Sequence, residues 1–440
     1  MGSSFLSSND SSPASAPAAA TPTTVPPAPA AAGNGRSFVF LQGVCSPFFG
    51  ELGAALRGAG ARVSKVNFNL GDEAFWRLPG ASAYRGPAEA LGPFYQDYFA
   101  RTAATDLVMF GDQRPVHQAA IPLARQAGMR VHVFEEGYFR PYWLTLERNG
   151  VNADSQLPRD PAWYRAVGAR LPHYRNGQAF DSSFAIRAWH DVVYHAHNLR
   201  NRWFYPEYRG HAPHSAWKEY GAFIGKGLGL RWRARRDRHE IDRLIRDDRR
   251  FYLLPLQLNS DSQIRQHSGF ADMNDVIAMA MASFARHAPG DSCLVIKSHP
   301  LDPGLDDHEG TVRRLARQFD IVDRAIFLET GHLPTLLSHT AGVATVNSTV
   351  GGSALVHSRP TIVLGRSIYD MPGLTFQGGL DAFWQDAEPP DMSLFVRFRN
   401  TVIHTTQVNG GFYSAPGIAM AVRNSAERLL AERSPLDALL

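Results

Sequence analysis

Two adjacent carboxylates are the sharpest catalytic candidates in the sequence. Glu135 and Glu136 follow the apolar pair 133–134 and precede Gly137, which indicates a constrained position at the end of a strand. Neighbouring strand residues point in opposite directions, so we expect one carboxylate to face a ligand and the other to hold a basic residue such as Arg140. A carboxylate so placed can act as a general base or as a nucleophile. A solvated turn is the alternative interpretation.

A second group of residues has the pattern of a phosphate site. Asn347, Ser348, Thr349 and Gly351 lead from a strand-like run into a helix-like one. Free backbone N–H groups and the helix dipole favour an anion at such a place, and the two hydroxyl groups add donors. An ordinary helix cap is the competing interpretation, because Ser and Thr are common there.

A histidine follows another apolar strand-like run, within the loop formed by Lys297, Ser298, His299 and Pro300. Its ring could hydrogen-bond or protonate a leaving phosphate, whereas a purely structural histidine is the alternative. The 17 histidines show no HExxH or Cys/His spacing, so we expect no metal. Neither GxxxxGK[ST] nor GxGxxG occurs, which argues against a P-loop NTPase and a simple dinucleotide enzyme.

The elements that must position these residues alternate along the chain. Such alternation predicts parallel sheets of doubly wound α/β type. The strand-like runs are 37–42, 62–68, 106–110 and 130–134, then 251–256, 293–297, 325–328, 342–346 and 360–364. The helix-like stretches are 48–59, 115–127, 272–287, 307–319, 394–402 and 418–430.

The 440 residues divide into segments of different composition. Residues 1–35, rich in Ala, Pro, Ser and Thr, lack the apolar content to offset ordering and are expected to be disordered. An N-terminal Rossmann-like domain is expected over 36–245, with an aromatic-basic helical insert at about 151–245. A second Rossmann-like domain is expected over 246–390, followed by C-terminal helices over 391–440.

Ligands of open α/β sheets bind outside the carboxyl ends of the strands. The predicted strand ends carry polar or glycine residues in both halves, so two polar rims should face one central cleft. Polar loops without function would look similar. In the first half the candidates for acceptor or sugar binding are Gln42, Gly43, Asn69, Asp112, Arg114 and Arg140.

Net charge and cysteine count indicate the compartment and the kind of ligand. The net charge of +4 is mildly basic, which fits an anionic substrate or membrane surface and does not demand nucleic acid. There are two cysteines, no apolar stretch of membrane-spanning length and no secretory pattern. We therefore expect a cytoplasmic protein, peripheral at the inner face of a membrane.

The segment 199–238 mixes Trp and Tyr with ten basic residues. It could contact anionic lipid, and charge reversal at Arg233, Arg235 and Arg236 would then weaken liposome binding. A solvated helix with core aromatics explains the same composition. The ten are Arg200, Arg202, Arg209, Lys218, Lys226, Arg231, Arg233, Arg235, Arg236 and Arg238.

Taken in order, these motifs resemble the KpsS/LipB-type capsule polysaccharide biosynthesis proteins of Gram-negative bacteria. The resemblance spans nearly everything after residue 36. Its segments are 40–43 with 46–49, 67–69 with 71–72, 110–115, 134–141 with 145–147, 255–257 with 261–264, 297–300, 347–351, and 369–370 with 372–375.

The resemblance implies a GT-B-like architecture of two Rossmann-like domains and a retaining β-Kdo transferase that uses CMP-Kdo without a metal cofactor. It implies Glu136 as nucleophile, although related retaining Kdo transferases carry Asp at this position, with Glu135 in support and His299 at the phosphate. The acceptor would be a glycerophospholipid such as (lyso)phosphatidylglycerol, with other capsule-assembly proteins as partners. The donor-binding set would be Gln257, Asp261, Lys297, Ser298, His299, Pro300, Asn347, Ser348, Thr349 and Gly351.

Two other functions remain open from the sequence. The first is an inverting, sialyltransferase-like CMP-sugar transferase, in which Glu136 would act as the base for the acceptor hydroxyl. The second is a non-catalytic partner in capsule export that binds lipid or polysaccharide through its aromatic-basic segment.

Overall fold

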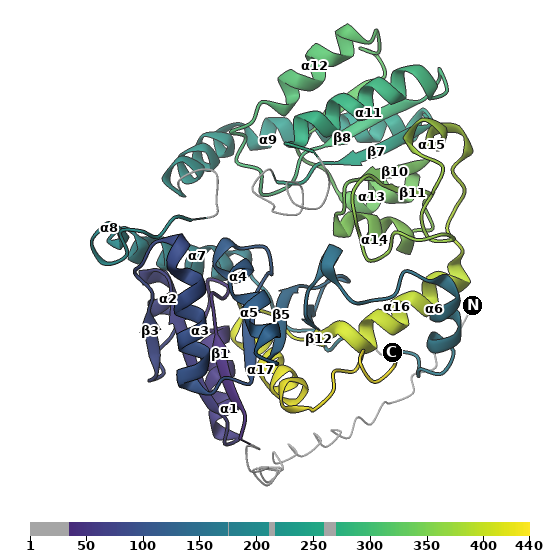
Figure 1. The fold of residues 1–440 in the computed structure, drawn as a ribbon. Coiled ribbons are helices and arrows are strands. Elements are labelled where there is room, and N and C mark those ends of the chain that lie inside the picture. Colours follow the sequence, from purple (N-terminus) through teal and green to yellow (C-terminus); the bar gives the residue numbers. More distant parts are fainter. Residues whose placement is uncertain (1–34, 175, 211–215, 259–269) are drawn as a thin grey trace, which may run out of the picture.

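The computed structural model describes residues 35–440 except 175, 211–215 and 259–269. The expected leader, apart from its last residue, and the candidate Asp261 lie outside the described residues. The described chain forms two α/β domains, each built on a largely or wholly parallel sheet (Figure 1). This is the GT-B-like pair of Rossmann-like domains that the sequence predicts.

The N-terminal sheet has the strand order β12-β6-β5-β4-β1-β2-β3. The four predicted runs of the first half are confirmed as β1, β2, β4 and β5, whereas β3, β6 and β12 were not predicted. Strand β6 is antiparallel to both of its neighbours. The strands are β1 Ser37–Phe40, β2 Arg62–Asn67, β3 Ala81–Ala83, β4 Asp106–Phe110, β5 Arg130–Glu136, β6 Trp143–Arg148 and β12 Gln407–Asn409. The helices beside them include α1 Phe48–Gly58, α2 Leu70–Ala74, α3 Leu91–Thr102, α4 Pro115–Gln118 and α5 Ala120–Gln126.

The second sheet is wholly parallel, in the order β11-β10-β7-β8-β9. All five predicted runs of the second half are confirmed. The strands are β7 Phe251–Pro255, β8 Cys293–Lys297, β9 Ala325–Leu328, β10 Gly342–Thr345 and β11 Thr361–Val363. The helices are α11 Met273–His287, α12 His308–Gln318, α13 Leu333–His339, α14 Thr349–Val356 and α15 Leu380–Asp386.

Two segments cross the expected domain boundaries. Helix α9 (Ala216–Arg246) packs Ile241 and Leu244 among the buried residues of β7 and β8. The segment 391–440 contains α16 (Met392–Thr406), β12 and α17 (Ala415–Leu430) and returns to the first domain. There β12 pairs with β6, while α17 packs against α1 and α16 against α6 (Pro161–Gly168). The tail is thus part of the N-terminal domain, as the yellow ribbon in Figure 1 shows.

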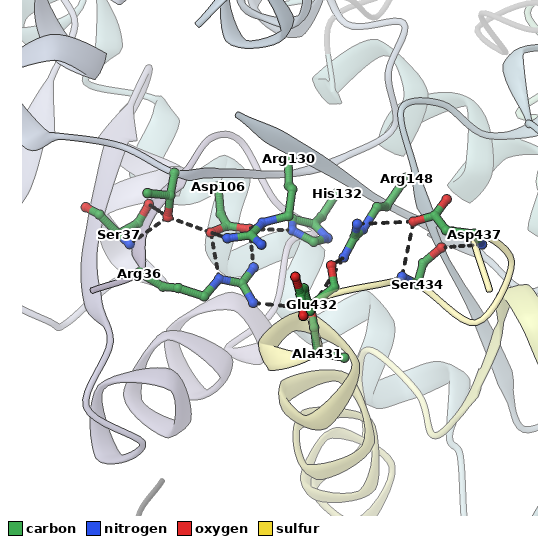
Figure 2. Close-up of polar contacts among 11 residues, drawn as sticks. Arg36, Ser37, Asp106, Arg130, His132, Arg148, Ala431, Glu432, Ser434 and Asp437 are labelled. Carbon is green, nitrogen blue, oxygen red and sulfur yellow. Dashed lines mark hydrogen bonds and ion pairs between the residues drawn. The ribbon is translucent and has the colours of Figure 1, made fainter. Parts of the chain in front are cut away.

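A buried ionic network joins this tail to the amino ends of the first sheet's strands (Figure 2). The Asp106 carboxylate accepts hydrogen bonds from Arg36, Arg130 and His132. Arg36 and Arg148 also donate to the carbonyl groups of Ala431 and Glu432, respectively. Burial alone would raise the pKa of Asp106, but the hydrogen bonds from His132 and Arg36 hold it well below its usual range. The network therefore stabilises the fold through an ionised Asp106.

Asp106→Ala should destabilise the fold by about 3–5 kcal/mol, because it leaves the buried Arg36 without its charge partner and the buried His132 without its hydrogen-bond acceptor. Urea unfolding at pH 7 measures the loss, and Asp97→Ala is the matched control, since its pair with Arg101 is exposed. A depressed folded pKa means that the stabilisation is present above the unfolded value near 4 and is lost as pH falls below it. The difference from wild type should therefore shrink in acid; a constant difference would contradict the ionic origin.

Candidate functional site

Glu136 ends β5 with its carboxylate between two arginines. Its Oε1 lies 3.8 Å from Arg187 Nη1, and its Oε2 lies 3.9 Å from Arg140 Nη2. The side chain is 29% exposed, so it can meet a ligand. Glu135 Oε1 accepts a hydrogen bond from the Glu136 backbone N–H at 2.9 Å. The neighbour of Arg140 is therefore Glu136 itself, which corrects the expectation that the supporting carboxylate holds this arginine.

The backbone around Glu136 is fixed by unusually close strand contact. A Cβ on Gly137 would overlap the backbone carbonyl of Trp143 on β6, so only glycine fits this position. The Glu136 carbonyl accepts from Thr145 Oγ1 at 3.0 Å. The Tyr138 N–H donates to Gln407 Oε1, at the start of β12, at 2.9 Å. Strands β6 and β12 thus hold the turn that carries Glu136.

A buried carboxylate lies beneath the same turn. The Tyr138 hydroxyl donates to Glu147 Oε1 at 2.6 Å and accepts from the Asn152 N–H at 2.7 Å, and Ser155 Oγ also donates to Glu147. Burial raises the pKa of Glu147 to about 7, although the hydrogen bonds from Ser155 and Tyr138 oppose the rise. This network fixes the position of the loop that follows Glu136, at the edge of the second domain.

His299, at the end of β8, contributes from the second domain. Burial, together with the charges of Lys297 and Arg140, lowers the pKa of His299 to about 4, and Arg187 adds to the effect. The Leu301 N–H donates to His299 Nδ1 at 3.1 Å, so the proton of the neutral ring lies on Nε2. His299 is therefore a neutral hydrogen-bond donor, in electrostatic reach of the two arginines that flank Glu136.

The rest of that loop is held internally. Ser298 is buried and its hydroxyl donates to Asp302 Oδ2 at 2.9 Å, while Lys297, also buried, donates to the Ser298 carbonyl at 3.2 Å. Lys226 of α9 donates to the Asp302 carbonyl at 2.9 Å. Ser298 and Lys297 thus shape the loop that presents His299, and their direct contact with a donor stays a prediction.

The loop between β10 and α14 forms the other part of this rim. Ser348 caps the helix by accepting from the Val350 N–H at 3.2 Å. Gln257 and Asn347 exchange two hydrogen bonds of 2.9 and 3.2 Å, which join the ends of β7 and β10. A Cβ on Gly351 would overlap the Tyr369 hydroxyl group. The start of α14 is therefore held in place by Gln257 and by Tyr369, whose hydroxyl group donates to the Ser348 carbonyl.

The two domains meet at this loop. A small cavity is lined by Tyr138 and Asn152 from the first domain and by Asn347, Thr349 and Arg366 from the second. Arg366 Nη2 also donates across the boundary, to the Ala153 carbonyl, at 3.0 Å. The Glu136 turn and the α14 loop thus approach each other from opposite sides.

The acceptor candidates of the first domain lie deeper than the sequence suggests. Gln42 and Asn69 are buried, and both hydrogen-bond Tyr194 of α7 (Phe184–Asn198). Asp112 is buried and accepts from the Val151 N–H, whereas Arg114 donates to the Gly43 carbonyl. These groups are buried or already hydrogen-bonded within the protein, and their binding role stays a prediction.

Two residues that line this region were not among the sequence candidates. Arg366 follows a predicted strand, so its place at a strand end was a usable signal. Arg187 lies in the aromatic-basic segment, where no pattern predicts which helix face reaches Glu136. Among the described residues, no group of three or more His, Cys, Asp or Glu side chains is arranged to hold a metal ion.

The chain is similar to two curated proteins over most of its length. It is 37% identical to the capsule polysaccharide export protein KpsS of Escherichia coli, over 86% of this chain and 97% of that protein. It is 34% identical to the capsule polysaccharide modification protein LipB of Neisseria meningitidis serogroup A, over 87% of this chain and 92% of that protein.

The similarity to solved structures is weaker. KpsC of Thermosulfurimonas dismutans, a β-Kdo 2,7 transferase, is 15% identical with a TM-score of 0.35, over 73% of this chain and 83% of that one. The family model described as capsule polysaccharide biosynthesis protein matches residues 105–413. Because this match covers more than half of the chain and includes both rims of the site, the chain belongs to the capsule polysaccharide biosynthesis protein family.

Proposed function

We propose that the chain is a retaining β-Kdo transferase that moves Kdo from CMP-Kdo to a glycerophospholipid such as (lyso)phosphatidylglycerol. The observation that carries the proposal is the partly exposed Glu136 carboxylate, held between Arg140 and Arg187 with neutral His299 in electrostatic reach. The family supplies the capsule context. The enzyme would work at the cytoplasmic face of the inner membrane, with other capsule-assembly proteins and without a metal cofactor.

The donor is an anion with one phosphate and one sugar carboxylate, which suits the charges of the site. The His299 Nε2–H would donate to a phosphate oxygen, and the N–H groups at the start of α14 would add further donors. Arg140 and Arg187 would pair with the carboxylate beside the anomeric carbon. In the resting protein both arginines neutralise Glu136, so donor binding would draw them partly away and free the carboxylate.

Retention follows from two displacements at the anomeric carbon. In the first, a Glu136 oxygen forms a bond to this carbon while the bond to the phosphate oxygen breaks, and CMP leaves with the electron pair. In the second, an acceptor hydroxyl oxygen attacks the same carbon, loses its proton to water or to the phosphate of the released CMP, and displaces the Glu136 carboxylate. The configuration inverts twice and is retained overall. An inverting enzyme would instead use Glu136 as the base, and the anomeric configuration of the product distinguishes the two.

Glu136→Gln should lower turnover of CMP-Kdo by roughly 10³-fold or more, because the amide keeps the shape of the side chain but cannot form the sugar ester. Glu135→Gln is the matched control and should retain far more activity. CMP release measures the effect, and the unfolding midpoint should be unchanged. Full activity in Glu136→Gln together with loss in Glu135→Gln would reverse the assignment.

His299→Ala should weaken CMP binding by about 1.5–3 kcal/mol, which is roughly ten- to a hundredfold in Kd, because a hydrogen bond to a charged phosphate is lost. Isothermal titration calorimetry measures the affinity. His339→Ala is the control, since His339 is exposed at the far end of α13 and bonds only its own helix. An unchanged Kd in His299→Ala would remove this residue from the donor site.

A further inference from the structure

Helix α7 and the short helix α8 (Asn201–Phe204) turn an apolar face to solvent. Trp189 is 65% exposed and Trp203 is 64% exposed. The spacing of three and four residues places 189, 192, 196, 199 and 203 along one side of the pair. The exposed apolar residues are Phe184, Ala185, Ile186, Trp189, Val192, Ala196, Leu199, Trp203 and Phe204.

The opposite face of α7 is polar and points into the protein. Tyr194 donates to Asp72 and bonds Gln42, while Asn198 accepts from the Gly71 N–H at 2.7 Å. Asn201 accepts from the Leu70 N–H at 2.9 Å. No residue of α7 is fully buried. The amphipathic pattern is thus the reverse of that of an ordinary surface helix, which buries its apolar side and exposes its polar one.

Basic residues outnumber acidic ones along this face. Between residues 184 and 204, Arg200 and Arg202 are exposed, and Asp191, whose side chain is 44% exposed, pairs with His195. Tryptophan favours the interface between lipid and water, and basic residues near it are attracted to anionic headgroups. A bilayer surface with anionic lipid therefore fits the tryptophan and arginine side chains of this face.

Two of the basic residues predicted for this role on α9, Arg233 and Arg236, are engaged elsewhere. Arg233 Nε lies 3.0 Å from Glu329 Oε2, and Arg236 contacts both Asp237 and Glu309. Charge reversal at Arg233 and Arg236 would break contacts within the second domain. The expectation that these two arginines face lipid is therefore corrected, and the charge-reversal variant built on them does not test membrane binding cleanly.

We infer that the apolar face of α7 and α8 is the surface by which the protein docks on an anionic lipid bilayer. The inference deepens the proposed function and rests on it for the nature of the acceptor. Because α7 carries Arg187 on its inner face, docking places the Glu136 site about one helix diameter, ~10–12 Å, from the headgroups. No helix among the described residues is long and apolar enough to cross a bilayer. In Figure 1, α8 projects at the left edge of the molecule.

The test is cosedimentation with vesicles of phosphatidylcholine alone or mixed with phosphatidylglycerol. The double variant Trp189→Ser/Trp203→Ser should lower the partition coefficient roughly tenfold or more on the mixed vesicles, because two large apolar side chains no longer enter the interface. Arg200→Glu/Arg202→Glu should lower it on the mixed vesicles only, and more at low salt. Val322→Ser/Val396→Ser, which changes two exposed valines outside the face, is the matched control and should bind like wild type.

A transfer assay separates docking from catalysis. With a short-chain glycerophospholipid dispersed as monomers, the double tryptophan variant should turn over like wild type. If the wild-type protein binds vesicles and the variant does not, but neither protein transfers Kdo, the result would support docking and contradict the proposed function. Unchanged vesicle binding by the variant would overturn the inference. So would conversion of a wild-type dimer into a monomer in light scattering, or loss of activity on the monomeric acceptor.

Discussion

The close approach of β5 and β6 at Gly137 is the constraint on which the site depends. The two backbones leave no space for a Cβ there, so only glycine can follow Glu136 directly. Strand β6 is held in turn by β12, which comes from the C-terminal tail. Gln407 of β12 accepts from the Tyr138 N–H and donates to Thr145. The position of the central carboxylate therefore requires that residues far along the chain return to the first sheet, where the Asp106 network also holds the tail.

The electrostatics of the site favour an anionic ligand. Burial lowers the pKa of His299, and the charges of Lys297, Arg140 and Arg187 add to this effect, so the ring is neutral. In the protein as described, Glu136 is the nearby carboxylate that pairs with two of these cations. A donor that brings a phosphate and a carboxylate would add negative charge beside these cations. The same arginine that contacts Glu136 stands on α7, so catalysis and docking would share one helix.

Local patterns predict much of this fold because its strands are short, apolar and buried. The nine predicted runs are all strands, whereas β3, β6 and β12 escaped detection. Strands β3 and β12 are three residues long, and β12 lies in a tail whose composition reads as helix. Its pairing partner lies more than 250 residues away, at a distance in sequence that no local pattern reports.

About as much of the site as of the fold could be predicted from the sequence. Strand-end position identified Glu136, His299 and the Ser348 loop as candidates, because parallel strands deliver their carboxyl ends to one edge. Position alone could not show that Gln42 and Asn69 are covered by α7, or that Arg187 turns toward Glu136 while Trp189 turns to solvent. Those facts depend on how one amphipathic helix is oriented, and its pattern is the inverse of the usual one.

The central claim is that Glu136 carries the sugar during transfer, and peptide mass spectrometry tests it most directly. Wild-type protein is mixed with CMP-Kdo without acceptor, quenched in acid within one turnover and digested. The account predicts one Kdo residue attached to the peptide that contains Glu136, and no such adduct in Glu136→Gln. A Kdo adduct on another residue, or no adduct together with a product of inverted configuration, would contradict it.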